Sequence, residues 1–156
     1  MYLWLKLLHI LAVVMFIGKI TTGVFWHKHA ESTRNPRLLA HTMLGVIRSD
    51  RLFTVPGVVI ILATGIFAAI QGGFPILGTG WILWTLVMFG ISGLVFMLRL
   101  APLQRRLHAH AQAGAASGSF DFEAYRRMAV QWEIWGSVAT LAPVIGLGLM
   151  VLKPAL

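Results

Sequence analysis

Four apolar runs, each about as long as a bilayer is thick, limit what this chain can fold into. They cover residues 3–26, 52–71, 81–101 and 129–152. About 20 helical residues cross the hydrocarbon core of a membrane, and backbone groups surrounded by lipid must bond to one another. We therefore expect each run to be a transmembrane helix. The fold class we expect is all-α, a four-helix transmembrane bundle in a single integral membrane domain, residues 1–156.

The composition agrees with an integral membrane protein, since 58% of the residues are hydrophobic and only 12% are charged. The first run is longer than the apolar region of a signal peptide and has no basic segment before it. It also lacks a small-x-small cleavage site before His27, so we expect it to remain as a span. The chain has no cysteine, which excludes disulfides, thiolate metal sites, iron–sulfur clusters and c-type haem bound through thioethers.

The basic residues indicate the topology. The positive-inside rule places connections rich in lysine and arginine in the cytoplasm, so we expect both termini outside, N-out/C-out. The second connection, QGGFPILGTG, carries no charge. We expect the basic connections to meet anionic lipid, so the lipid bilayer is the expected partner and the net charge of +8 requires no nucleic acid. Ten of the 13 basic residues lie in or beside the first and third connections, namely Lys28, Arg34, Arg37, Arg48, Arg51, Arg99, Arg105, Arg106, Arg126 and Arg127.

The two basic connections differ in composition. The first mixes apolar and basic residues and begins with Pro36, a good first helical residue. We expect a cytoplasmic helix there, which enters the second run either continuously or with a break near Pro56. The third connection, HAHAQAGAASGSFDFEAY, is rich in small residues, and we expect it to be flexible, with Ser119 or Asp121 capping the last helix.

The first run carries ionisable side chains near its outer end. Lys6 and His9 are three residues apart and share a helix face, but only the long lysine side chain reaches the interface. A neutral imidazole in lipid needs a partner, so His9 either makes a hydrogen bond between helices, binds haem or a metal ion, or transfers protons. For the hydrogen bond we expect Thr85, or a backbone carbonyl near Gly146 or Gly148, as the acceptor.

A second group of charges lies in the cytoplasmic half of the runs. Lys19 is about 15 Å deeper than His9, and the last run supplies a counter-charge at Glu133. We expect these two side chains to be close or bridged by an arginine, in a cluster that is either functional or a structural ion pair. The expected buried polar cluster consists of Lys19, Arg48, Asp50, Arg51, Arg99 and Glu133.

Histidines and methionines bear on metal binding. His27 with His29, and His108 with His110, form two His-x-His pairs in the inner connections, and His41 lies between them in the sequence. This spacing alone is weak evidence for a metal site. The seven methionines form no MxM or MxxM group, which argues against a copper permease.

Several stretches resemble a known superfamily. WLKLLHILAVV, FWHKHAES, DRLFTVPGVVIILATGI and MVLKP together resemble the superfamily of bacterial copper-resistance protein D and the HemJ-type protoporphyrinogen oxidases. The whole chain is similar to a bacterial integral membrane family of unknown function within it, which implies a multi-pass protein of the bacterial cytoplasmic (inner) membrane. The residues that match the family pattern are Trp4, Lys6, His9, Arg51, Leu52, Glu133, Lys153 and Pro154.

The resemblance also implies a cofactor. HemJ-type proteins bind b-type haem through transmembrane histidines, one of them at the start of the third span. Here that stretch reads GWILW, and Trp84 stands where the second histidine would be, so bis-histidine ligation and protoporphyrinogen chemistry are not expected. Haem b would instead be held by His9 alone or together with Met88 or Met150, with Lys6 facing a propionate.

These observations favour a redox or haem-related role with His9 as the axial ligand. Two other classes stay open: a non-catalytic accessory subunit or scaffold of a larger membrane complex, and a transporter for a metal or small solute. A homo-oligomer is also compatible with the sequence. No nucleophile with a matching base, phosphate loop or nucleic-acid motif was found, and whether the protein is an enzyme is left open.

Overall fold

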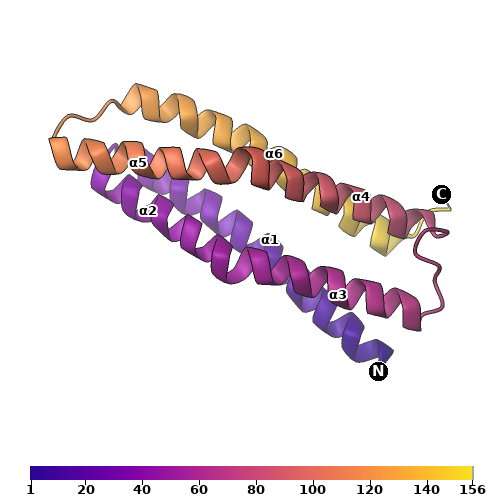
Figure 1. Ribbon diagram of the computed structural model, residues 1–156. Helices are drawn as coiled ribbons and strands as arrows, with labels where there is room; N and C mark the ends of the chain where they lie inside the picture. The colour runs from indigo at the N-terminus through magenta and orange to yellow at the C-terminus, as the bar shows by residue number, and fades with distance from the viewer. Residues whose placement is uncertain (156) are drawn as a thin grey trace.

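The computed structural model describes residues 1–155, which form four long helical rods (Figure 1). The first rod is α1 (Tyr2–Ser32) and the last is α6 (Phe122–Leu152). The second consists of α2 (Pro36–Ser49), the π-helical turn η1 (Asp50–Thr54) and α3 (Val55–Gln71); the third consists of α4 (Gly80–Val95), the π-helical turn η2 (Phe96–Leu100) and α5 (Ala101–Ser117). All four rods are long and apolar enough to span a membrane, and residues 1–155 contain no strand, which confirms the expected fold class.

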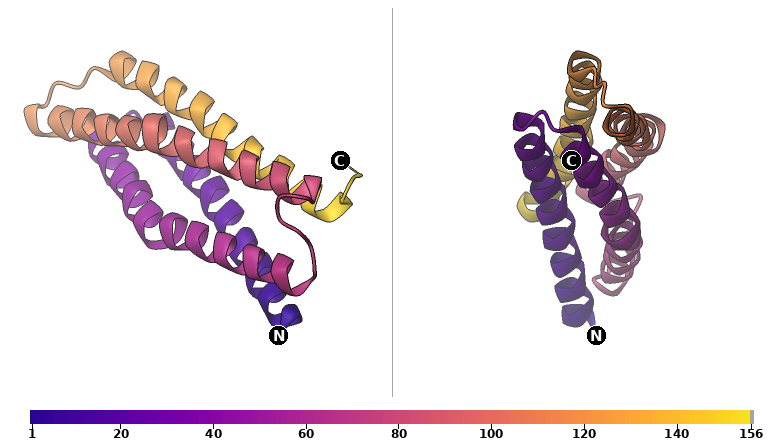
Figure 2. Two further views of the ribbon diagram at one scale, coloured as in Figure 1. Left: turned by 45° about the vertical axis from the view of Figure 1, so that its right-hand side comes forward. Right: turned by 90° about the vertical axis from the view of Figure 1, so that its left-hand side faces the viewer.

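Both termini and residues 72–79 lie at one end of the molecule (Figures 1 and 2). We call this end the outer end, after the predicted topology. The opposite end consists of α2, α5 and the adjoining parts of α1 and α6, and we call it the inner end. The rods contain 31 to 38 residues, whereas a bilayer requires about 20. Each rod is therefore longer than its apolar run and continues at the inner end.

The first connection is helical, as expected, and it enters the second run without a break. The structure places η1 directly before Val55 and Pro56, and η2 in the same way before Ala101 and Pro102. Proline has no N–H and its ring crowds the carbonyl four residues earlier, so a wider turn just before it keeps each rod continuous.

The expectation of a flexible third connection is wrong. Residues 108–117 belong to α5, and only a short segment separates Ser117 from Phe122. Alanine has the highest helix propensity, and Ala111 on this stretch is fully buried against the neighbouring helices. Gly118, with φ +72°, ends α5 in the left-handed region that favours glycine. The expected cap is confirmed for Asp121, whose side chain accepts a hydrogen bond from the Ala124 N–H at 2.9 Å.

The rods change partners along their length. At the outer end α1 packs against α3 and α4 packs against α6, whereas at the inner end α2 packs against α5 (Figure 2). The larger hydrophobic core lies at the inner end, and its fully buried members include Leu39, Met43, Leu107 and Tyr125. A smaller core of Ala12, Phe16 and Ile61 joins α1 to α3.

Candidate functional site

His9 joins α1 to α3 through its ring. Its Nδ1 lies 2.9 Å from the carbonyl oxygen of Ile61 and 3.3 Å from Oγ1 of Thr64. A carbonyl oxygen only accepts, so the bond to Ile61 requires the hydrogen on Nδ1. In the neutral ring the lone pair is then on Nε2, the nitrogen that can bind a metal.

A glycine makes room for this ring. A Cβ atom on Gly65 would lie 2.9 Å from Cε1 of His9, which is closer than real Cβ contacts allow, and 3.2 Å from Nδ1. Any larger residue at position 65 would therefore displace the ring. The sequence pattern did not single out Gly65, because its role depends on which helix lies beside His9.

The hydrogen bond between helices that we expected of His9 is present, but its acceptor differs. Thr85 donates to the carbonyl of Gly146 at 3.2 Å and to that of Trp81 at 2.7 Å. Thr85 and Gly146 therefore bond to each other and join α4 to α6. The expected acceptors were wrong because His9 faces α3, whereas Thr85 and Gly146 bond to each other.

The other residues expected around a haem lie on three helices. Lys6 is exposed on α1, one turn toward the outer end from His9, while Met88 on α4 and Met150 on α6 are half-buried. The rings of Phe16 and Phe89 are 5.9 Å apart and Thr85 lies opposite Gly146, which sets the relative heights of the helices. By this register Met150 lies at about the height of His9, and Met88 about 9 Å deeper, at 1.5 Å per residue.

Lys19 has a different partner from the expected one. Its ammonium group pairs with Asp50, which is buried in η1, and Asp50 also accepts hydrogen bonds from Thr54 at 2.8 Å and from Gln104 at 2.9 Å. The carboxylate is therefore fully paired, as a buried charge requires. Within residues 1–155 Lys19 forms no ion pair with Glu133, so that expected pair is wrong.

The remaining members of the expected cluster do not join it. Arg48, Arg51 and Arg99 have exposed side chains and form no ion pair within the described residues. The Arg99 guanidinium lies over the Trp135 ring, 5.2 Å from its centre. Exposed arginines beside the first and third connections agree with the predicted contact between these connections and anionic lipid.

Glu133 belongs to a separate group at the inner end, which we call the inner charge cluster: His27, Lys28 and Glu31 of α1, with Arg126 and Glu133 of α6. Lys28 Nζ lies 2.6 Å from Glu133 and 3.4 Å from Glu31. Arg126 lies 3.0 Å from Glu31 and 3.3 Å from Glu133. Two carboxylates and two cations thus balance each other, nine residues along α1 from Lys19, or about 13 Å.

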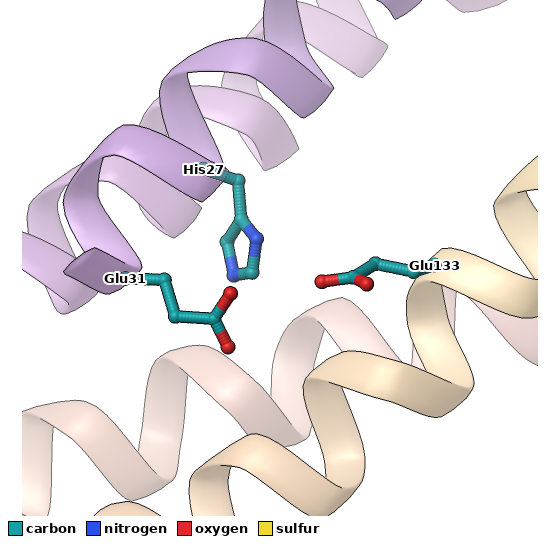
Figure 3. Close-up of side chains that lie close together, drawn as sticks. All are labelled: His27, Glu31 and Glu133. Atoms are coloured by element: carbon teal, nitrogen blue, oxygen red, sulfur yellow. The ribbon is translucent and has the colours of Figure 1, made fainter.

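His27 lies at the centre of this cluster. Its side chain is fully buried, and Nε2 is 3.0 Å from the Tyr125 hydroxyl. Its Nδ1 has no hydrogen-bond partner within the described residues. The ring points toward the carboxylates of Glu31 and Glu133 (Figure 3), and one ligand atom from each of the three side chains lies within 4.8 Å of the others.

The combination of His27, Glu31 and Glu133 was not evident from the sequence. His27 was considered together with His29, two residues away, but the structure buries the first and exposes the second. The relevant spacing is His27 with Glu31, four residues apart on one helix face. The third member, Glu133, is paired with Lys19 in the sequence-based prediction because both lie in the cytoplasmic halves of their runs.

Four apolar rods joined by buried polar side chains define an integral membrane protein of the all-helical class. The chain belongs to a family described as predicted integral membrane protein (DUF2269), whose family model matches residues 3–154. No curated protein and no solved structure matches the chain. The family match confirms the expected membrane family of unknown function, while the resemblance to copper-resistance protein D and HemJ stays a prediction.

Proposed function

We propose that this multi-pass membrane protein binds haem b through Nε2 of His9 and has a redox role in the membrane. The observation that supports this is the 2.9 Å contact between His9 Nδ1 and the Ile61 carbonyl. In metal-binding histidines, a hydrogen bond from one ring nitrogen to a carbonyl orients the ring and raises the basicity of the other nitrogen. His9 has this arrangement inside an apolar span.

The surrounding residues fit such a ligand. Gly65 leaves space for the ring, and Met150 on α6 lies at about the height of His9, so it is the better of the two methionines as a second axial ligand. Lys6 is exposed on the same face of α1, toward the outer end, where its ammonium group can pair with a propionate. The haem iron would supply the one-electron chemistry, and the protein would tune it through the axial ligands.

An absorption spectrum tests this proposal. Protein purified in detergent with haem supplied should show a Soret band, and His9→Ala should remove it. His41→Ala is the matched control, because His41 is exposed on α2 and should leave the band unchanged. Gly65→Ala should reduce haem binding without removing the ligand, since it displaces the ring. A protein that binds no haem, or a band that persists in His9→Ala, would contradict the proposal.

A groove between α1 and α2 favours a second candidate function, as an accessory subunit that packs against another membrane protein. The groove has a volume of about 750 Å³, and Gly18, Gly23 and Gly45 on its walls face open space. Small residues let helices approach closely in lipid. Gly45→Leu should fill the groove and lower the mass of any native complex measured in mild detergent; an unchanged mass would count against this function.

A further inference from the structure

His27 is unusual among the buried polar groups of this protein. It is fully buried, yet Nδ1 makes no hydrogen bond among the described residues. Leaving such a nitrogen without a partner costs free energy that a native fold normally avoids. When Nε2 donates to the Tyr125 oxygen at 3.0 Å, Nδ1 holds the lone pair and has the form that binds a metal ion.

The position of the His27 ring beside two carboxylates gives it a chemical meaning. The ring points toward Glu31 and Glu133, and each of the three side chains presents one ligand atom within 4.8 Å of the others (Figure 3). His27 and Glu31 are held in register by one turn of α1, and Glu133 comes from α6. We propose that the inner charge cluster is a binding site for a divalent transition-metal ion, with His27, Glu31 and Glu133 as ligands.

The donor set indicates which ions fit. One imidazole and two carboxylates suit Zn²⁺ and related transition-metal ions, whereas Ca²⁺ and Mg²⁺ prefer oxygen ligands only. Ligand atoms around tetrahedral zinc are about 3.4 Å apart, given bond lengths near 2.1 Å. The two glutamates must therefore move inward by roughly an ångström, which a rotation of each carboxylate provides, with water completing the coordination.

The two cations of the cluster act as competitors of the metal ion. Lys28 holds both carboxylates, and so does Arg126. Their side chains are 44% and 38% exposed, so both can turn toward water when a metal ion takes their place. Lys28 then serves as the stand-in for the ion, and its removal should strengthen metal binding. If the cluster were only a structural ion-pair network, removing Lys28 would weaken the network and would not strengthen metal binding.

Binding of the ion would join the first helix of the chain to the last one. Two ligands lie on α1 and one on α6, and His27 also contacts Tyr125 and Trp132 of α6. The ion would therefore close the bundle at the inner end. This inference is independent of haem at His9, which lies more than 15 residues away on α1, or about 27 Å.

Zinc titration of the untagged protein in detergent tests the site. One Zn²⁺ should bind per chain, and Glu133→Gln should weaken binding by at least about 100-fold, because losing a ligand costs more than the 10- to 100-fold typical of an outer-shell partner. Lys28→Gln should tighten binding by about tenfold, as a competing charge is removed. His27→Gln should behave like Glu133→Gln.

His29→Gln is the matched control, since His29 is two residues away on the same helix and exposed. Its zinc affinity should equal that of the unmodified protein. Circular dichroism and gel filtration check that each variant folds, and Glu133→Gln remains informative if the buried His27 variant does not. Unchanged affinity in Glu133→Gln, or unchanged or weaker affinity in Lys28→Gln, would overturn the proposal.

Discussion

The two ends of this molecule are held together in different ways. At the outer end, α1 with α3 and α4 with α6 form two pairs, with a small core between α1 and α3 and a few hydrogen bonds between helices. At the inner end, α2 and α5 pack with the ends of α1 and α6 around a larger core that includes Leu39, Leu107 and Tyr125. Lipid tails are as apolar as leucine, so the hydrophobic effect stabilises helix packing in water and not in the bilayer. The larger core of the inner end is of the kind that stabilises a helical bundle in water.

The largest expected effect concerns which end faces the cytoplasm. Reporters fused at residues 75 and 115 should report opposite compartments, with residue 115 in the cytoplasm, because the basic residues flank the first and third connections. Compartment-specific reporters, one active on each side, provide the measurement. A cytoplasmic signal from the fusion at residue 75 would contradict the predicted topology, because the larger core would then lie outside the cell.

A cavity in the inner core should cost more than one at the outer end. Leu107 is fully buried, and Leu107→Ala should lower the free energy of unfolding by about 4 kcal/mol. Ile61→Ala, in the smaller core, should cost about 2 kcal/mol, because lipid or detergent tails can fill part of the space. Unfolding in mixed micelles with increasing denaturing detergent measures both. Equal losses would show that both ends are packed in the same way.

The Lys19–Asp50 pair lies at the border between the two ends. Asp50→Ala should lower the free energy of unfolding by about 3 kcal/mol, since it leaves the Lys19 charge buried without its partner. The double variant Lys19→Met with Asp50→Leu should be more stable than Asp50→Ala, because it removes both charges. Additive losses in the same unfolding assay would indicate that the two residues act separately.

The smallest effect is expected from the hydrogen bonds of the outer end. His9→Phe removes the bond to the Ile61 carbonyl and should cost about 1 kcal/mol in the absence of haem. Thr85→Val removes the bond to the Gly146 carbonyl in the other pair and should cost a similar amount. The losses of the two variants should add in the double variant, since the two hydrogen bonds share no residue. A loss well above the sum would mean that the two pairs stabilise each other.

Features that depend on one helix were predictable from the sequence. The four spans follow from run length, and a hydrogen bond between helices is one of the alternatives that the cost of a buried imidazole leaves for His9. The partners of Lys19, His9 and Glu133 were not predictable, because they depend on which helices are neighbours and at what height. The length of α5 was also missed, since alanine and glycine were both counted as loop-forming small residues although alanine favours the helix.

The two π-helical turns explain how a single rod can serve both ends. A π turn adds one residue to an α-helix, and at 3.6 residues per turn this rotates everything beyond it by about 100° around the axis. The residues of α2 that face α5 and those of α3 that face α1 therefore need not lie on one stripe, and the same holds for α5 and α4. Deleting a single residue within Asp50–Thr54 would remove this offset and turn one half of the rod away from its neighbour. Each of these two rods therefore has two contact faces, one for each end of the molecule, and the π-helical turn sets the angle between them.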